Sequence, residues 1–266
     1  MRTRLSALVV ALAFVLAACG GSSSSTASDT LPPISAPAPT APATTLPPGC
    51  GAAATKSISY TATAKNPGEL AIYETPAAPE PVRTMTNPRY INEDPNAPVD
   101  LLFLVKDAPV ADACQWVEVY LPMRPNGSSG WVKRTDVTLA ANPFRIEADL
   151  GSFNLTVYEK GNVIKEIPIA VAADNTPTPG GLYYITELVK TPNPGGVYGP
   201  YAYGLSGFSE VHQTFNGGPG QLGIHGTNQP QYIGQQVSNG CLRMTNEDIT
   251  ELSKILPLGV PVEVIA

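Results

Sequence analysis

The stretch IHGTNQPQYIGQQVSNGCLRM, residues 224–244, decides how the rest of this chain is interpreted. It contains a thiol, Cys241, and an imidazole, His225, with fifteen residues between them. Gly226 follows the histidine and Gly240 precedes the cysteine. A cysteine nucleophile requires a base such as histidine, and glycine lets a substrate backbone approach closely. The stretch therefore predicts a thiol site, provided that the fold brings the two side chains together.

A free cysteine is more often a small buried apolar side chain than a nucleophile, so the prediction depends on its neighbours. We expect a histidine adjacent in space to take the thiol proton and to lower the pKa of Cys241. The bare carbonyl of Gly226 could hold the imidazole ring. The amides around Gly240 and Cys241 could donate to an oxyanion.

Two motifs around this pair, HGT at residues 225–227 and SNGCLRM at residues 238–244, closely resemble the signature of the L,D-transpeptidases, the YkuD-type catalytic domain of bacterial cell-wall enzymes. Residues 176–180, 193–196 and 257–262 also look like features of that family. The resemblance implies that residues 143–266 form an L,D-transpeptidase catalytic domain with a β-sandwich fold.

The resemblance implies a role for each matching residue. Cys241 would be the nucleophile, His225 the base, and Gly226 the residue whose carbonyl orients the ring. Substrate binding or pocket shaping is assigned to six others: Gly240, Ser238, Arg243, Asn239, Thr227 and Tyr203. Arg243 could meet a substrate carboxylate or equally buttress the loop. Many family members carry histidine at the position of Asn239, so no second imidazole is expected here.

The reaction implied by the family is acyl transfer without a metal or a cofactor. Cys241 would attack the carbonyl between a diamino acid and D-alanine in a peptidoglycan tetrapeptide stem, and a stem-peptide amine would resolve the thioester as a 3-3 cross-link. Water as acceptor would give an L,D-carboxypeptidase, and a protein amine would give attachment of that protein to the wall. Carbapenems, which resemble acyl donors, are expected to modify Cys241 covalently. A non-catalytic peptidoglycan-binding lipoprotein is the alternative from another class.

The N-terminus predicts export and lipidation. Arg2 and Arg4 precede an apolar run, residues 5–18, which is too short to span a bilayer and suits an export signal. The run ends on LAACG, residues 16–20, which resembles a bacterial lipobox. Residues 1–18 are therefore expected to be a lipoprotein signal peptide and Cys19 the lipidated residue. Residues 19–49 would be a Ser/Thr/Pro-rich tether, and the protein would be extracytoplasmic, anchored to the cell membrane and facing the cell wall.

Composition agrees with an exported β protein. Without Arg2 and Arg4 the chain carries 14 basic and 22 acidic side chains, a formal charge of −8. An acidic body argues against nucleic acid or an anionic membrane surface as partner. The 24 glycines and 28 prolines favour short strands and turns over long helices. Two histidines and scattered acids do not make a metal site.

Two cysteines remain, Cys50 and Cys114. Outside the cytoplasm such a pair is usually a disulfide. It would close a loop of about 65 residues and contribute about 4 kcal/mol on the chain-entropy model. The rival pairings use Cys241 and would block its chemistry.

Residues 50–142 are expected to form a small SH3-like β-barrel module. Strands are predicted at residues 57–64, 71–73 and 101–105, and a hairpin at residues 115–121 and 130–133. This hairpin resembles that of bacterial SH3-like domains. Trp116 and Trp131 are expected in the barrel core, the alternative being a wall-binding platform.

The C-terminal domain is predicted to be mainly β with one short helix near the C-terminus. A hairpin is expected at residues 153–158 and 163–171, and strands at 182–186 and 260–265. Residues 192–223 are expected to be loops that form the walls and lid of a substrate cleft. Thr245 would cap the helix, and its apolar stripe would end on Ile255 or Leu256.

Overall fold

The computed structural model describes residues 56–91, 96–107, 114–214 and 218–266, and these belong to one compact unit that spans Thr45–Ala266. The predicted signal peptide, the tether, Cys19 and Cys50 lie outside the described residues, so their assignments stay predictions. Within the described ranges, no helix is long and apolar enough to cross a membrane.

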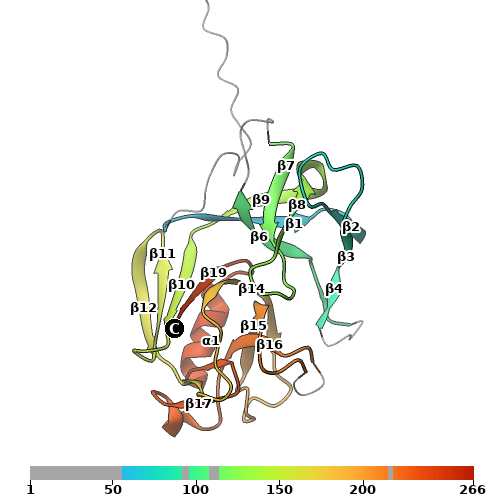
Figure 1. The fold of residues 1–266 in the computed structure, drawn as a ribbon. Coiled ribbons are helices and arrows are strands. Elements are labelled where there is room, and N and C mark those ends of the chain that lie inside the picture. Colours follow the sequence, from blue (N-terminus) through green and yellow to red (C-terminus); the bar gives the residue numbers. More distant parts are fainter. Residues whose placement is uncertain (1–55, 92–95, 108–113, 215–217) are drawn as a thin grey trace, which may run out of the picture. The chain divides into compact units, whose positions relative to one another are not determined.

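The N-terminal module, residues 56–142 as far as they are described, contains a five-stranded antiparallel sheet (Figure 1). In spatial order its strands are β8 (Ser129–Lys133), β7 (Trp116–Tyr120), β6 (Leu102–Asp107), β1 (Ser59–Ala64) and β9 (Val137–Asn142). Two short pairs accompany the sheet: β2 (Gly68–Ile72) with β3 (Arg83–Asn87), and β4 (Arg89–Tyr90) with β5 (Pro98–Val99). A 3-10 turn, η2 (Arg134–Asp136), joins β8 to β9.

Trp116 and Trp131 are not core residues, contrary to the prediction. Successive side chains of a strand point to opposite faces, and it is Val117 and Val132 that enter the apolar core of the module. The two tryptophans are half-buried on the other face. There Trp116 packs edge-on against Tyr73, with ring centroids 5.0 Å apart. The similarity of the module to SH3-like barrels stays a prediction.

The C-terminal part is built on an eight-stranded sheet with the order β12-β11-β10-β19-β14-β15-β16-β18 (Figure 1). Its strands are β10 (Phe144–Asp149), β11 (Asn154–Glu159), β12 (Asn162–Pro168), β14 (Gly181–Lys190), β15 (Tyr201–Phe208), β16 (Gln221–His225), β18 (Leu242–Arg243) and β19 (Pro261–Ile265). A parallel pair, β13 (Val171–Ala172) with β17 (Gln236–Ser238), and a 3-10 turn, η3 (Pro230–Tyr232), complete it with the helix α1 (Asn246–Ile255). One apolar cluster, from Ile146 to Val264, forms its core.

The prediction of a mainly β fold with one short helix near the C-terminus is confirmed. Thr245 is the N-cap of α1, because its side chain accepts a hydrogen bond from the amide of Asp248 at 3.1 Å. Leu256, which is 5% exposed, completes the apolar stripe, whereas Ile255 is 40% exposed. The two predicted hairpins correspond to β7 with β8 and to β11 with β12.

The segment 192–223, which was predicted to consist of loops, contains a complete strand, β15. It pairs with both β14 and β16. Its glycines weakened the strand pattern in the sequence, and side chains of β14 explain them. A Cβ at Gly204 would lie 2.3 Å from Oε1 of Glu187, and a Cβ at Gly207 would lie 2.3 Å from the Tyr183 ring. The glycines of β15 therefore leave room for large residues of its neighbour.

The N-terminal module packs directly on the C-terminal sheet. Tyr184 of β14 is fully buried, and its hydroxyl lies 3.2 Å from the carbonyl oxygen of Tyr120 and 3.4 Å from that of Leu102. A Cβ at Gly259 would lie 2.1 Å from Cγ2 of Thr61. These contacts join the two sheets into one body.

Candidate functional site

Cys241 and His225 line the same cleft, which has a volume of about 430 Å³. Its walls come mainly from β14, β15 and β16 and from the segments that join them. Pro192, Tyr198 and Gly220 are among its lining residues, in agreement with the prediction that residues 192–223 supply the walls of a cleft.

Parallel pairing of β16 with β18 brings the thiol to the imidazole. Ile224 lies opposite Leu242, and His225, the last residue of β16, lies opposite Arg243. Cys241 immediately precedes β18, and its Sγ is 3.8 Å from the position that a Cβ of Gly223 would occupy. The two groups, which have fifteen residues between them in the sequence, are therefore neighbours across one edge of the sheet.

His225 is oriented by its own neighbour, as predicted. The residue is 4% exposed, and Nδ1 lies 2.6 Å from the carbonyl oxygen of Gly226. A carbonyl only accepts hydrogen bonds, so Nδ1 carries the proton and Nε2 keeps its lone pair. Burial lowers the pKa of His225 to about 4, with the charge of Arg243 acting in the same direction and the Gly226 hydrogen bond opposing both. The imidazole is neutral near pH 7.

Cys241 is a partly exposed, free thiol. Burial raises its pKa, while a backbone hydrogen bond from Gly223 and the charge of Arg243 act to lower it. The prediction that the histidine depresses the pKa of the thiol is therefore wrong for the resting protein, because desolvation outweighs the other effects. The resting pair is a neutral thiol beside a neutral base.

The turn before Cys241 is held by hydroxyl groups. Ser238 is 1% exposed; its Oγ donates to the carbonyl oxygen of Cys241 at 2.6 Å and accepts from the amide of Gly240 at 3.3 Å. Thr176 donates to the carbonyl of Ser238 at 3.0 Å, and Thr178 to that of Gly240 at 2.9 Å. Ser238 thus shapes the turn rather than contacting a substrate. Since the Gly240 amide is engaged, the Cys241 amide is the one left for an oxyanion.

Arg243 and Asn239 lie beside the thiol without lining the cleft. The backbone of Arg243 exchanges two hydrogen bonds with Ala170, at 2.8 and 2.9 Å, and these hold the strand that follows Cys241. Its positive charge acts on the pKa of both Cys241 and His225. Asn239 is exposed, next to the buried Gly240. These are backbone contacts, so the role of the Arg243 side chain, as a contact for a substrate carboxylate or as a buttress, stays a prediction.

Tyr203 and Thr227 are placed differently from the substrate contacts that were predicted. Tyr203 is 1% exposed, and its hydroxyl donates to the carbonyl of Leu252 at 2.9 Å, so its side chain fastens β15 to α1. Only the strand backbone is left to form the wall at this position. Thr227 is 4% exposed, and its amide donates to Oδ1 of Asn246 at 2.9 Å. Both residues therefore support the site through contacts with α1.

Asn246 is a site residue that the sequence did not reveal. Besides accepting from Thr227, its Oδ1 would be 2.3 Å from a Cβ at Gly226 and 2.1 Å from a Cβ at Gly199. The first residue of α1 therefore fixes the segment whose carbonyl holds His225. In the sequence it shows only as a polar residue at a helix N-terminus, which gives no sign of this contact.

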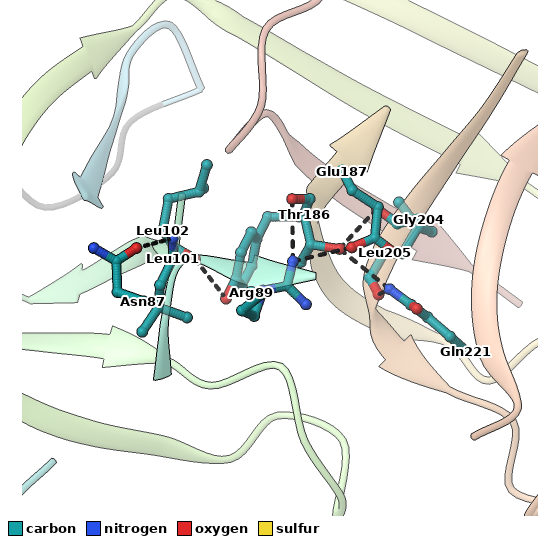
Figure 2. Close-up of polar contacts among 10 residues, drawn as sticks. Asn87, Arg89, Leu101, Leu102, Thr186, Glu187, Gly204, Leu205 and Gln221 are labelled. Atoms are coloured by element: carbon teal, nitrogen blue, oxygen red, sulfur yellow. Dashed lines mark hydrogen bonds and ion pairs between the residues drawn. The ribbon is translucent and has the colours of Figure 1, made fainter. Parts of the chain in front are cut away.

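Glu187 was also missed, since it appears in the sequence as one polar residue of a strand. It lines the cleft, and its side chain is 12% exposed. Figure 2 shows its carboxylate beside the guanidinium of Arg89, at 3.0 Å. Arg89 belongs to the N-terminal module, as does Ile91, which also lines the cleft.

Other ligand-forming side chains of the described ranges stay apart from the site. Cys114 is buried. Its predicted partner, Cys50, is not among the described residues, so the pairing itself stays a prediction. The same ranges contain no group of three His, Cys, Asp or Glu side chains that could hold a metal ion.

Comparison with known proteins shows which family residues 143–264 resemble. Residues 143–264 match the family described as the L,D-transpeptidase catalytic domain, YkuD. A Bacillus licheniformis protein assigned to the L,D-transpeptidases as YkuD is 41% identical over 122 residues, which cover 46% of this chain and 66% of that protein. The protein of the same name from Bacillus subtilis is 40% identical with the same coverage. This chain thus spans just under two thirds of the length of these relatives.

Two solved structures illustrate the likeness. An L,D-transpeptidase from Mycobacterium smegmatis is 14% identical, over 62% of this chain and 90% of that chain, with a TM-score of 0.37. The catalytic domain of the E. faecium L,D-transpeptidase acylated by ertapenem is 27% identical, over 46% of this chain and 96% of that chain, with a TM-score of 0.33. The family match and the identity to the two Bacillus proteins agree that residues 143–264 resemble the YkuD family of L,D-transpeptidase catalytic domains.

Proposed function

We propose that this protein is a peptidoglycan L,D-transpeptidase that forms 3-3 cross-links through a Cys241 acyl-enzyme. The observation that carries the proposal is the hydrogen bond from Nδ1 of His225 to Gly226, in a cleft shared with Cys241. It fixes the tautomer in which Nε2 is free to take a proton, which is what a thiol of raised pKa requires.

In the acylation step, the proton of the Cys241 thiol passes to Nε2 of His225 as sulfur attacks the carbonyl carbon between the diamino acid and D-alanine. The amide of Cys241 is the donor best placed to stabilise the developing oxyanion. When the tetrahedral intermediate collapses, the C–N bond breaks and the amine of D-alanine leaves with the proton from His225. A thioester between Cys241 and the stem remains.

In the second step, an amine of another stem attacks the thioester carbonyl. His225 takes a proton from the attacking amine, the C–S bond breaks, and the sulfur recovers a proton from the imidazole. The neutral resting pair suits this sequence, because the complete cycle begins and ends with an uncharged thiol and an uncharged base. The same acyl-enzyme would give an L,D-carboxypeptidase with water as acceptor, or wall attachment with a protein amine.

Incubation with a purified disaccharide tetrapeptide distinguishes these functions. The wild-type protein is expected to form cross-linked dimers and to release D-alanine, and Cys241→Ala to form neither. Tripeptide monomers without dimers would identify a carboxypeptidase. Identical mixtures from the wild type and from Cys241→Ala would indicate a peptidoglycan binder without catalysis.

The envelope location is part of the same proposal and rests on the sequence. Cleavage before Cys19 and lipidation of that residue would tether the catalytic domain at the outer face of the cell membrane. Cys19→Ala is expected to leave the membrane fraction of a bacterial host, while the wild type remains in it. Equal partition of the two proteins would argue against the lipid anchor.

A further inference from the structure

Arg89 is built firmly into the N-terminal module. Two residues before it, the buried side chain of Asn87 accepts a hydrogen bond from the amide of Leu101 and donates one to the carbonyl of Asn66, both at 2.8 Å. Arg89 itself pairs with Val99 in the β4–β5 ladder. The position of its guanidinium is therefore set by the module (Figure 2).

From this position Arg89 reaches the wall of the cleft. Its Nη2 lies 3.0 Å from Oε2 of Glu187 and 3.3 Å from the carbonyl oxygen of Thr186. On the other side of the carboxylate, Gly204 leaves just enough room for Oε1. Because the Glu187 side chain is 12% exposed, removal of Arg89 would leave a largely desolvated charge without its partner. Arg89 thus decides where the carboxylate of Glu187 lies in the cleft.

The contact extends across three strands of the wall (Figure 2). The hydroxyl of Thr186 in β14 donates to the carbonyl of Gly204 in β15 at 3.1 Å. The side-chain amide of Gln221 donates to the Thr186 hydroxyl at 3.2 Å and to the carbonyl of Leu205 at 2.9 Å. Gln221 is the first residue of β16, and His225 is the last. The network that begins at Arg89 therefore ends on the strand that carries the base.

Arg124 makes a second contact between the module and the cleft. Its Nη2 donates to the carbonyl oxygens of Ser209 and His212, at 2.8 and 3.0 Å, and its Nη1 donates to that of Pro219 at 2.9 Å. Pro219 lines the cleft. One guanidinium thus holds three carbonyl groups between the end of β15 and the start of β16.

Asn126 completes this contact. Its side-chain amide nitrogen donates to the carbonyl of Phe208 at 2.8 Å, and its Oδ1 accepts from the amide of Phe208 at the same distance. Phe208 is the last residue of β15, and the guanidinium of Arg124 lies 4.8 Å from its ring centroid. The Asn126 side chain therefore pairs with the last residue of β15 much as the backbone of a neighbouring strand would, and Arg124 lies against the ring of that residue.

We propose that the N-terminal module holds the walls of the catalytic cleft in position for the substrate, with Arg89 and Arg124 as its positioning residues. Neither guanidinium lines the cleft, so neither touches the reacting atoms. Each acts through a wall residue: Arg89 through Glu187, and Arg124 through Pro219. The inference rests on the proposed transpeptidase function. Loss of either arginine would let its wall residue move. The stem peptide would then bind more weakly and be oriented less well, while the chemistry of the thiol would stay unchanged.

The test uses the full chain with Arg89→Ala and Arg124→Ala, assayed on the disaccharide tetrapeptide. For each variant kcat/KM is expected to fall about tenfold, mainly through a higher KM. Alkylation of Cys241 by iodoacetamide, which needs no peptide-shaped cleft, is expected to stay within about twofold of the wild type. Arg89→Lys keeps a cation beside Glu187 and is expected to recover part of the loss. In a Glu187→Gln background, Arg89→Ala is expected to add little, because the two residues act as a unit.

Tyr184→Phe is the matched control, since it removes a hydrogen bond between the module and the C-terminal sheet without touching the cleft. It is expected to lower Tm and to leave KM unchanged. If Tyr184→Phe raised KM as much as the arginine variants do, or if folded arginine variants kept the wild-type KM, the inference would be overturned. Should an alanine variant fail to fold, Arg89→Lys and Asn126→Ala are measured instead against the same criteria. Absence of any turnover by the wild type would refute the proposed function itself.

Discussion

The Nδ1 proton of His225 is donated to the carbonyl oxygen of the adjacent residue, Gly226, at 2.6 Å. A backbone carbonyl orients the ring here, and a neutral carbonyl stabilises an imidazolium less than a carboxylate would. Together with burial, this arrangement keeps the resting imidazole neutral.

Stability should fall in acid because of His225. Its pKa is about 4 in the folded protein and about 6.5 in a model peptide, so between these values the unfolded chain binds the proton and the folded one does not. Its contribution is fully present above pH 6.5 and is lost as pH falls to 4, about 3 kcal/mol in all. Urea unfolding at pH 7, 5.5 and 4 measures it. His225→Gln serves as control, and an equally steep acid loss in that variant would contradict the assignment.

The acylation rate should begin to fall only at an unusually low pH. If neutral His225 is the base, acylation of Cys241 persists until the imidazole is protonated, near pH 4. The rate of carbapenem acylation between pH 4 and 8, followed by loss of carbapenem absorbance, measures this fall. A rate that halves near pH 6.5 would instead indicate a base with an unperturbed pKa.

Asn246 should support catalysis without touching the substrate. Asn246→Ala leaves the buried amide of Thr227 without its acceptor, which costs about 1–3 kcal/mol. It also frees the segment that orients His225, so we expect kcat/KM to fall about tenfold. Asn246→Asp keeps an acceptor oxygen at the helix N-terminus, where negative charge is favourable, and should retain most activity. Equal losses in the two variants would rule out the hydrogen bond as the cause.

Gly240→Ala should damage the thiol site itself. Gly240 has φ +121°, a conformation that alanine adopts at a cost of about 1–3 kcal/mol. Gly234 is the matched control: its φ is +84°, it has open space where a Cβ would lie, and it does not line the cleft. Both alanine variants should lower Tm by a few degrees. Only Gly240→Ala should slow acylation of Cys241, and slow acylation in both would mean that the effect is one of general stability.

The local features of this fold could be predicted from the sequence. The cap at Thr245 and the hairpin of β11 with β12 depend on neighbours in the chain, and the sequence shows both. The pair of Cys241 and His225, and the carbonyl of Gly226, follow from short motifs whose parts lie close together in the chain. Such features need no knowledge of long-range packing.

Features that depend on packing between distant segments were missed or misplaced. The strand β15 was not predicted, because its glycines weaken the strand pattern. They are needed to leave space for the side chains of Glu187 and Tyr183 on a neighbouring strand. The role of Asn246 exists only once α1 packs beside Gly226. The thiol pKa was predicted with the wrong sign, because the sequence shows the histidine but not the desolvation.

Tyr203 shows a further limit. The sequence places an aromatic residue next to the site, but the register of β15 decides which face it occupies. The contacts of Arg89 and Arg124 with the cleft likewise join segments about a hundred residues apart, and nothing in either local sequence indicates them.

The most direct test of the central claim is the intact mass of the folded protein after incubation with a carbapenem. The account predicts a single covalent adduct on the wild type, located at Cys241 by peptide mapping, and no adduct on Cys241→Ala. His225→Gln should form the same adduct far more slowly. A folded wild-type protein that keeps an unmodified thiol at Cys241 would contradict the acyl-transfer mechanism.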